Sequence, residues 1–382
     1  MNENTTSKRA PSIDFLTSTV TLAILAGIAY FVFSPLARTK MDFYNELWGP
    51  AHLLMRGNSP YDTASLDPEL PAVWLPMAIG VFAPLGLLKE QVALKIWLSI
   101  NIIELAAIVW LITRHSMSAL LMPIMGLFAY FFPPTINHFA LGQFSITSMF
   151  CLMISVYFLE KYFDWVAGIF LALGLAKPQL GLLAIFGLGI FFINHGGLQR
   201  ALLFGARVLI AALVMSLPLF IAYPEWIPDW IASFQSNNYE WLHPSLFSVF
   251  ERTLGIWGYA IWGVLTIALC VLCYQIWTRM PPRTAMLWSL GLTTIITPYI
   301  WSWDFVLLLP IWFHTFTQVN WKKRIFLSLT YLICWAGIAS IQLSANNNNY
   351  GFWWVPLWYM ISIAFVTHWT NLFPRAALVT RT

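Results

Sequence analysis

The stretch that decides the fold is FLTSTVTLAILAGIAYFVFSPL at residues 15–36, followed by ARTKMDFYNELWGPAHLLMRGNSPYD at residues 37–62. The first part contains no Asp, Glu, Lys or Arg and is long enough for a membrane helix, which needs about 20 mostly apolar residues. The second part predicts an aromatic-rich loop at the membrane surface, with Asp42 just beyond the helix end. A carboxylate at that depth is placed to act on a polar group attached to a lipid, although it could also merely solvate the loop.

Composition extends this prediction to the whole chain. Of the 382 residues, 59% are hydrophobic and only 9% are charged, and the mean hydropathy is +0.70. A soluble domain carries about 25% charged residues. The apolar runs lack the alternation of apolar and polar residues that strands of a membrane barrel show. We therefore expect an all-α, polytopic integral membrane bundle that forms a single transmembrane domain over residues 1–382.

Thirteen apolar segments are candidates for membrane crossings. They are residues 15–36, 71–88, 92–113, 116–133, 143–160, 163–176, 178–194, 201–222, 253–277, 284–300, 302–318, 325–343 and 351–370. Segment 71–88 carries three prolines, which suits an interfacial or re-entrant piece, and segment 116–133 is short. One of these two is expected not to cross, so we predict twelve or thirteen transmembrane segments.

Charges between the segments predict the orientation, because basic loops mark the cytoplasmic side. The basic residues at alternate loops are Lys8, Arg9, Lys161, Arg200, Arg207, Arg279, Arg283, Lys322, Lys323, Arg324, Arg375 and Arg381. Both termini are then cytoplasmic, the loops 37–70 and 224–252 lie outside, and the protein resides in the plasma (inner) membrane. The net charge of +4 comes from these inner loops and indicates no nucleic-acid partner.

Two charged residues interrupt apolar runs at expected outer helix ends. Lys177 lies in LALGLAKPQLGLL, where Pro178 predicts a helix break, and Asp304 lies in TPYIWSWDFVLLLP next to Trp303. A charge in a bilayer costs a few kcal/mol unless it is paired or faces water, so each is a functional candidate. We expect Lys177 to lack a protein partner and to meet an anionic lipid phosphate. The alternatives are a snorkelling lysine and an interfacial helix start.

Four further polar residues are candidates in other apolar surroundings. Asn137, His138 and Gln143 occur in PTINHFALGQ, ahead of another apolar segment, where they could bind substrate or cap helix ends and form a turn. Glu104 lies in the middle of SINIIELAAIV, and a structural pair with Lys95 inside the bundle is the preferred interpretation.

The outer polar residues suit sugar transfer from a lipid-linked phosphate donor. A carboxylate such as Asp42 takes the proton from the acceptor hydroxyl as that oxygen attacks the anomeric carbon. A cation, Lys177 with Arg56 or Arg252, stabilises the phosphate that leaves with its lipid. Aromatic and amide side chains stack on and hydrogen-bond to the sugar.

These residues resemble motifs of glycosyltransferase family 87, the polyprenyl-phosphate-mannose-dependent mannosyltransferase-like enzymes of the GT-C superfamily. The matching residues are Asp42, Tyr44, Ala51, Leu53, Leu54, Gly57, Pro60 and Tyr61, then Val73 to Pro76, Gly142 and Gln143, Ala176 to Pro178, Thr297 and Pro298, and Ser302 to Asp304. Tyr44 follows Asp42 by two residues instead of four, and Asp304 and Phe305 stand where the family has a late histidine.

The resemblance implies a GT-C-like fold and an inverting transfer of mannose or another hexose or pentose. The donor would be a polyprenyl-phosphate sugar and the acceptor a lipid or glycan at the extracytoplasmic face, with no cofactor and no metal. It implies that Asp42 is the catalytic base. The expected substrate-binding residues are Tyr44, Tyr61, Asn137, Gln143, Lys177, Trp303 and Asp304.

Two other functions use the same features. A transporter or flippase of lipid-linked sugars would also carry outer aromatics and intramembrane charges, although the internal repeats common in transporters are not evident. An accessory subunit without activity would leave Asp42 dispensable. The sequence leaves the donor sugar, the acceptor and the length of the lipid chain open.

Overall fold

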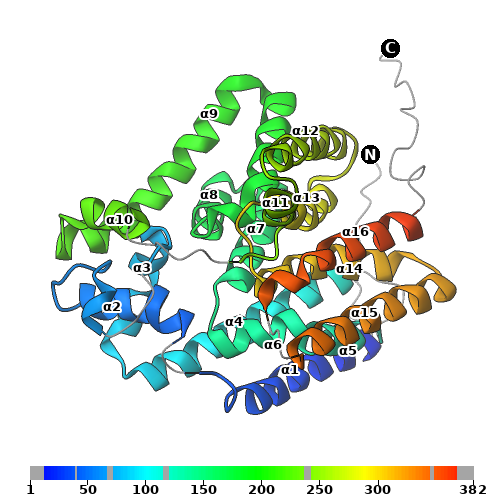
Figure 1. Cartoon of the computed structure of the whole chain (residues 1–382), viewed down its shortest axis with the longest axis horizontal. Coiled ribbons are helices and arrows are strands. Elements are labelled where there is room, and N and C mark those ends of the chain that lie inside the picture. Colours follow the sequence, from blue (N-terminus) through cyan, green and yellow to red (C-terminus); the bar gives the residue numbers. More distant parts are fainter. Residues whose placement is uncertain are drawn as a thin grey trace, which may run out of the picture.

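A computed structural model shows the chain as a bundle of helices (Figure 1) and describes residues 13–38, 41–66, 72–114, 120–235, 242–344 and 348–367. These ranges contain helices, turns and bends but no strand, which confirms the all-α prediction. Both chain ends lie outside the described residues, so their cytoplasmic location stays a prediction.

Six helices are long and apolar enough to cross a membrane, which makes this a multi-pass membrane protein. They are α1 (Ile13–Phe33), α4 (Glu90–Thr113), α9 (Leu182–Ala222), α12 (Ile256–Arg279), α15 (Trp321–Gln342), and η6 (Asn349–Phe352) together with α16 (Trp354–Thr367). A seventh span is formed if α6 (Pro133–Leu141) and α7 (Ser145–Leu159), which are bent by 110° at their junction, are counted as one. Within the described ranges, the helices that are long and apolar enough to cross a membrane therefore number six or seven, fewer than the twelve or thirteen segments predicted.

The difference arises because several apolar segments form short helices. Helix α3 (Pro76–Phe82) has 7 residues, α5 (Leu121–Tyr130) has 10 and α8 (Asp164–Gly174) has 11. At about 1.5 Å per residue they span roughly 10–17 Å, well below a hydrocarbon core of about 30 Å. Both segments suspected of not crossing, 71–88 and 116–133, are among these short pieces.

Helix α9 contains two of the predicted segments, 178–194 and 201–222. The two limbs meet at Gly197, whose φ of 71° and ψ of −179° are not helical. Glycine populates positive φ readily because it lacks a Cβ atom. Figure 1 shows the chain of α9 bending sharply near its midpoint, so the predicted break between these segments is confirmed.

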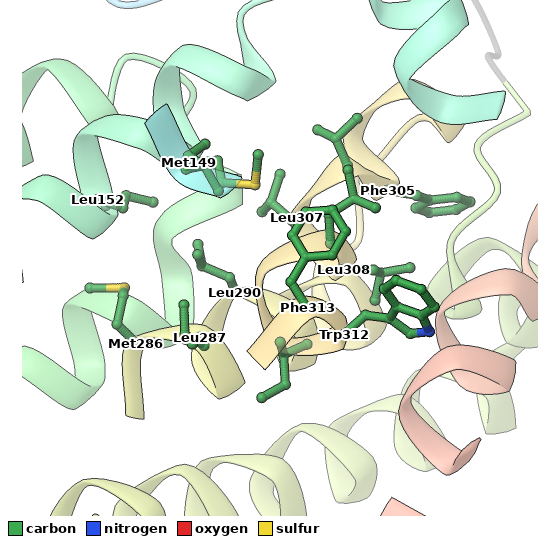
Figure 2. Packing of buried hydrophobic residues seen from close by; sticks show 14 of the residues in the cluster. Met149, Leu152, Met286, Leu287, Leu290, Phe305, Leu307, Leu308, Trp312 and Phe313 are labelled. Carbon is green, nitrogen blue, oxygen red and sulfur yellow. The ribbon is translucent and has the colours of Figure 1, made fainter. Parts of the chain in front are cut away.

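The core lies where α7, α13 (Pro282–Ile296) and α14 (Leu309–Gln318) meet, and Figure 2 shows its packing. Met149, Leu290, Leu308 and Phe313 are completely buried there. Helix α13 is buried from Ala285 to Ile296, a stretch that is apolar except for the hydroxyl side chains Ser289, Thr293 and Thr294. This core fixes the position of the start of α7, next to Gln143, and of the stretch between α13 and α14 that carries Asp304.

The stretches expected as outer loops contain short helices in their described parts. The first holds η1 (Tyr44–Trp48), α2 (Gly49–Leu54) and η2 (Thr63–Leu66). The second holds α10 (Trp226–Gln235) and most of α11 (Leu246–Leu254). Residues 67–71 and 236–241 lie outside the described ranges.

Candidate active site

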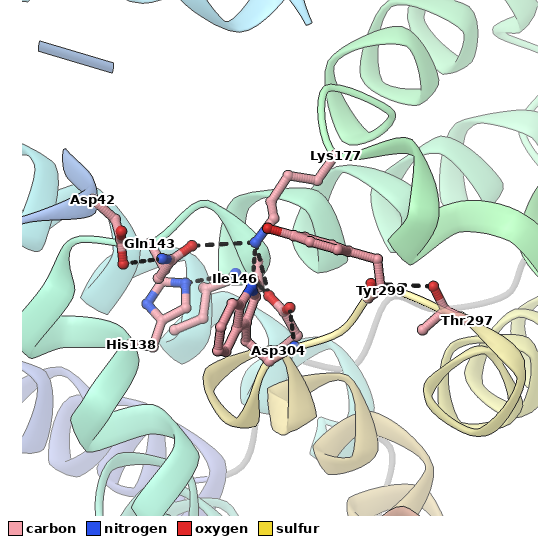
Figure 3. Close-up of polar contacts among 10 residues, drawn as sticks. Asp42, His138, Gln143, Ile146, Lys177, Thr297, Tyr299 and Asp304 are labelled. Atoms are coloured by element: carbon pink, nitrogen blue, oxygen red, sulfur yellow. Dashed lines mark hydrogen bonds and ion pairs between the residues drawn. The ribbon is translucent and has the colours of Figure 1, made fainter. Parts of the chain in front are cut away.

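Hydrogen bonds and an ion pair join side chains that lie far apart in the sequence (Figure 3). The Gln143 Nε2 donates to Asp42 Oδ2, and Gln143 Oε1 accepts from Lys177 Nζ at 3.2 Å. Lys177 Nζ lies 2.9 Å from Asp304 Oδ1 and 3.4 Å from the Ser145 hydroxyl. We call these five residues the polar network. It links the two carboxylates through one amide and one ammonium group.

Asp304 is the most firmly held member of this network. Its Oδ1 accepts from the Ser145 hydroxyl as well as from Lys177. Its Oδ2 accepts from the backbone N–H of Trp301 at 2.9 Å, at the start of the 3₁₀ helix η5 (Ser302–Leu308). Such donors satisfy a buried carboxylate, which explains how Asp304 can be 0% exposed.

Local backbone features bring these side chains to one place. Gly142 ends α6 with a φ of 71°, and a Cβ atom there would lie 2.5 Å from Phe43 Cβ, so this close approach requires glycine. The turn at Gly142 lets α7 leave at a steep angle and points Gln143 at Asp42. Pro178 follows Lys177 and begins the 3₁₀ helix η4 (Pro178–Gly181), so that Lys177 stands at a helix break as predicted.

Lys177 has a protein partner, contrary to expectation. Its side chain is only 5% exposed and forms an ion pair with Asp304. An isolated charge in an apolar interior is costly, whereas a paired and hydrogen-bonded one is tolerated. The two residues are 127 positions apart, so nothing local in the sequence signals their contact.

The surroundings of Asp42 make it a better base than an ordinary aspartate. Burial raises the pKa of Asp42 from 3.8 to about 6, although the hydrogen bond from Gln143 and the charge of Lys177 lower it in part. A carboxyl with this pKa is still ionised at neutral pH and accepts a proton more readily than free aspartate. General-base catalysis is most effective when the pKa lies near the working pH.

Glu46, about one helical turn after Asp42, is not among the site residues predicted from the sequence. Its Oε2 accepts from the backbone N–H groups of Val73 at 2.8 Å and Trp74 at 3.2 Å. Burial, together with the nearby charge of Asp42, raises the pKa of Glu46 to about 8, although the hydrogen bonds from Val73 and Trp74 act to lower it. The group is therefore mostly protonated at neutral pH and ties the 41–48 segment to the chain at Val73. The sequence feature that could have identified Glu46 as part of the site is its spacing of four residues from Asp42.

The two tyrosines predicted to bind substrate contact the backbone instead of the polar network. The Tyr44 hydroxyl donates to the carbonyl of Leu66 at 2.8 Å, and its ring stacks on Trp48. The Tyr61 hydroxyl donates to the carbonyl of Trp74 at 3.4 Å. Both side chains are buried, so in this arrangement they hold the segments around Asp42 in place.

Four aromatic side chains, Tyr299, Trp301, Trp303 and His243, pack against one another near Asp304. We call them the aromatic wall. Trp303 stacks on Trp301 with ring centroids 5.0 Å apart, and His243 lies 4.3 Å from Tyr299 and 4.8 Å from Trp301. Figure 3 shows the Tyr299 ring pointing toward Lys177. Trp303 Nε1 and His243 Nδ1 are buried and have no hydrogen-bond partner within the described part of the chain. They are available to a ligand that carries hydroxyl groups.

His243 had no signal in the sequence that singled it out. Burial lowers its pKa to about 4, although the charge of Asp304 acts to raise it. The imidazole is therefore neutral at pH 7 and can donate one hydrogen bond and accept another.

Asn137 does not take part in the hydrogen bonds that define the polar network. Its neighbour His138 is the buried residue at this point, and His138 Nε2 accepts from the backbone N–H of Ile146 at 3.0 Å in the first turn of α7. Arg56 and Arg252, considered as additional cations, are both exposed.

The expected pair of Glu104 with Lys95 is wrong. Both residues lie on α4, about 13 Å apart along its axis. Lys95 is exposed, and Glu104 Oε2 accepts from the Thr147 hydroxyl at 2.7 Å on the neighbouring helix α7. The pairing fails because residues on one straight helix meet only at spacings of three or four.

Among the residues that the structure describes, no three His, Cys, Asp or Glu side chains are grouped so that they could hold a metal ion. The expectation that the reaction needs no metal stays a prediction.

Comparison with known proteins gives one match. The family model described as glycosyltransferase family 87 matches residues 75–298, which is more than half of the chain. The matched region includes Gln143 and Lys177, whereas Asp42 precedes it and Asp304 follows it. No curated protein and no solved structure matches.

Proposed function

Because the chain belongs to glycosyltransferase family 87, we propose that it transfers a sugar from a polyprenyl-phosphate donor to a lipid- or glycan-linked acceptor. The polar network carries this proposal, since it connects a half-buried carboxylate of raised pKa, Asp42, to a buried cation, Lys177, through Gln143. Base and cation are thus held on either side of a single amide group.

Asp42 is the general base in this reaction. The acceptor hydroxyl attacks the anomeric carbon of the sugar while its proton passes to the Asp42 carboxylate. The bond between that carbon and the phosphate oxygen breaks, and the lipid phosphate leaves with the electron pair. Attack from the side opposite the leaving group inverts the anomeric centre. The raised pKa of about 6 supports this role.

Lys177 and the aromatic wall bind the donor. Lys177 Nζ stabilises negative charge on the leaving phosphate. Its three N–H groups have acceptors in Asp304, Ser145 and Gln143, so a direct contact with the phosphate replaces one of these three. The rings of Trp301 and Trp303 offer a flat apolar surface for a sugar. Trp303 Nε1 can donate a hydrogen bond to a sugar hydroxyl.

The proposal extends to the side of the membrane and to the substrates. The alternation of basic and acidic loops favours a site at the extracytoplasmic face of the plasma membrane, with both termini cytoplasmic. Mannose or another hexose or pentose is the proposed sugar, and membrane lipids surround the protein. The proposed chemistry uses no cofactor.

Asp42→Asn tests the proposal directly. The substitution keeps the size and can keep a contact with Gln143, but it removes the base. Loss of a general base typically lowers turnover by about 10²–10⁴-fold. Transfer from a radiolabelled polyprenyl-phosphate sugar should be measured on purified wild-type and mutant protein with equal melting temperatures.

A matched control is Glu225→Gln, because Glu225 is an exposed carboxylate in the stretch before α10. It should retain wild-type transfer. Near-full transfer by Asp42→Asn would remove the base role from Asp42. Movement of the lipid-linked sugar between leaflets without a new glycosidic bond would support the transporter alternative.

A further inference from the structure

A cavity lies near the C-terminal end of α7, the helix whose first turn carries Ser145 of the polar network. This cavity has a volume of about 520 Å³ and lies between the ends of α4, α7, α13 and α14. Its lining includes apolar side chains such as Ile112 and Met153 and polar ones such as Tyr157, Arg283 and His314. We call it the basic cavity.

The basic cavity is separate from the candidate active site. Ser145, at the first turn of α7, belongs to the polar network, whereas Tyr157 lies near the last turn of the same helix. At about 1.5 Å per residue, the two residues are about 18 Å apart along the axis. None of the five network residues lines the basic cavity.

Three cations converge on the Tyr157 ring, which forms part of the cavity wall. The guanidinium groups of Arg283 and Arg114 lie 4.9 Å and 5.5 Å from its centroid, and Lys161 Nζ lies 5.1 Å from it. Glu160 is the single carboxylate among the lining residues, and it forms an ion pair with Arg283. Positive charge therefore exceeds negative charge around this ring.

One of these cations has unused hydrogen-bonding capacity. Arg114 Nε is buried and has no hydrogen-bond acceptor among the described residues. A buried donor without an acceptor is unfavourable, and three neighbouring cations repel one another. An anion at this end of the bundle would offset the repulsion among the three cations.

We propose that the basic cavity binds the phosphate group of an anionic phospholipid. Arginine and lysine are the usual ligands of phosphate groups, and basic pockets between membrane helices bind anionic head groups. The apolar walls, formed by residues such as Met153 and Met286, favour a lipid over a free phosphate ion because they can contact acyl chains. The position agrees with the predicted cytoplasmic side, because Lys161 and Arg283 are among the basic residues that predict that side.

The test uses the full-length protein in a neutral detergent and three probes: dioctanoyl phosphatidylglycerol, dioctanoyl phosphatidylcholine and inorganic phosphate. Binding is measured by native mass spectrometry and by the melting temperature. We expect phosphatidylglycerol to bind and to raise the melting temperature, and phosphatidylcholine to bind at least about tenfold more weakly, which corresponds to one charge-assisted contact. Equal binding of both lipids would overturn the proposal. Equal binding of inorganic phosphate would overturn the assignment to a lipid.

Two variants with opposite expected effects separate binding from folding. Lys161→Met removes one cation and should weaken phosphatidylglycerol binding by about tenfold. Glu160→Gln removes the carboxylate that competes for Arg283 and should tighten binding, a gain that a purely structural role for these charges does not produce. Lys322→Met is the matched control, because Lys322 is an exposed lysine that lies over Trp321, outside the cavity lining. Unchanged affinity in both Lys161→Met and Glu160→Gln would overturn the proposal.

Discussion

The two ends of α7 hold charged groups in opposite ways. At its first turn, near Ser145, the ion pair of Lys177 and Asp304 has side chains that are 5% and 0% exposed. At its last turn, the ion pair of Arg283 and Glu160 has side chains that are 44% and 25% exposed. Buried charges must be matched within the protein, whereas exposed charges are solvated and can remain in excess. The first end therefore suits the proposed sugar transfer, and the second suits the proposed anionic lipid head group.

The largest expected effect on stability is at the buried end. Lys177→Met leaves Asp304 as a buried carboxylate without its counter-charge, which should lower the free energy of unfolding by about 3–5 kcal/mol. The double variant Lys177→Met with Asp304→Asn should recover part of this loss, because no uncompensated charge remains. Chemical unfolding of the purified proteins in detergent measures both.

An equal stability of Lys177→Met and wild type would contradict the buried ion pair. The sequence predicted a lysine without a protein partner, and removing the charge of such a lysine would hardly affect stability. The contact with Asp304 reverses that consequence.

The pH dependence of transfer should report on Asp42. With a pKa of about 6, the carboxylate is mostly ionised at about pH 7 and mostly protonated at about pH 5. The turnover number should therefore fall about tenfold over this interval, since the base must be ionised to accept a proton. A profile that is flat down to about pH 5 would indicate an ordinary aspartate pKa instead.

Glu46 should make the folded protein less stable as the pH rises. Its pKa is raised from 4.5 in the unfolded chain to about 8 in the folded protein. Its contribution to stability is thus fully present below about pH 4.5 and is lost as the pH rises through about 8. Glu46→Gln should change the free energy of unfolding at pH 7 by only about 1 kcal/mol, because an amide oxygen can still accept from Val73 and Trp74.

Melting temperatures recorded from acid to alkaline pH distinguish the two proteins. The wild type should lose stability with rising pH more steeply than Glu46→Gln. Parallel curves would show that Glu46 does not titrate in this range.

The smallest expected effect on stability is at the exposed end. Arg283→Gln breaks a solvent-accessible ion pair, and such pairs contribute less than about 1 kcal/mol. The unfolding free energy, measured without anionic lipid, should therefore change far less than in Lys177→Met. If Arg283→Gln lost as much unfolding free energy as Lys177→Met, the proposed difference between the buried and the exposed ion pair at the two ends of α7 would be wrong.

Much of the fold was determined by local sequence. Charge-free apolar runs such as residues 15–36 predict membrane helices because hydropathy acts over a single helix. The same reasoning located the break in α9 near Gly197 and the helix break at Lys177. Fewer helices than predicted are long enough to cross by themselves, because an apolar segment such as 116–133 is equally compatible with a short helix packed among others.

The sequence predicted individual residues of the candidate site but not the contacts between them. Asp42, Gln143, Lys177 and Asp304 were each chosen because a polar side chain stood in or beside an apolar run. Their contacts depend on which helix ends meet, and those ends are separated by 101 positions for Asp42 with Gln143 and by 127 for Lys177 with Asp304.

The sequence by itself thus determined a helical membrane protein with an acidic residue after its first helix. The tertiary structure decided that Lys177 is paired, that Gln143 lies between base and cation, and that His243 belongs to the aromatic wall. The physical reason is the distance along the chain over which each effect acts. Helix formation and membrane insertion depend on residues that are close in sequence, whereas the pairing of buried charges depends on the packing of the whole bundle.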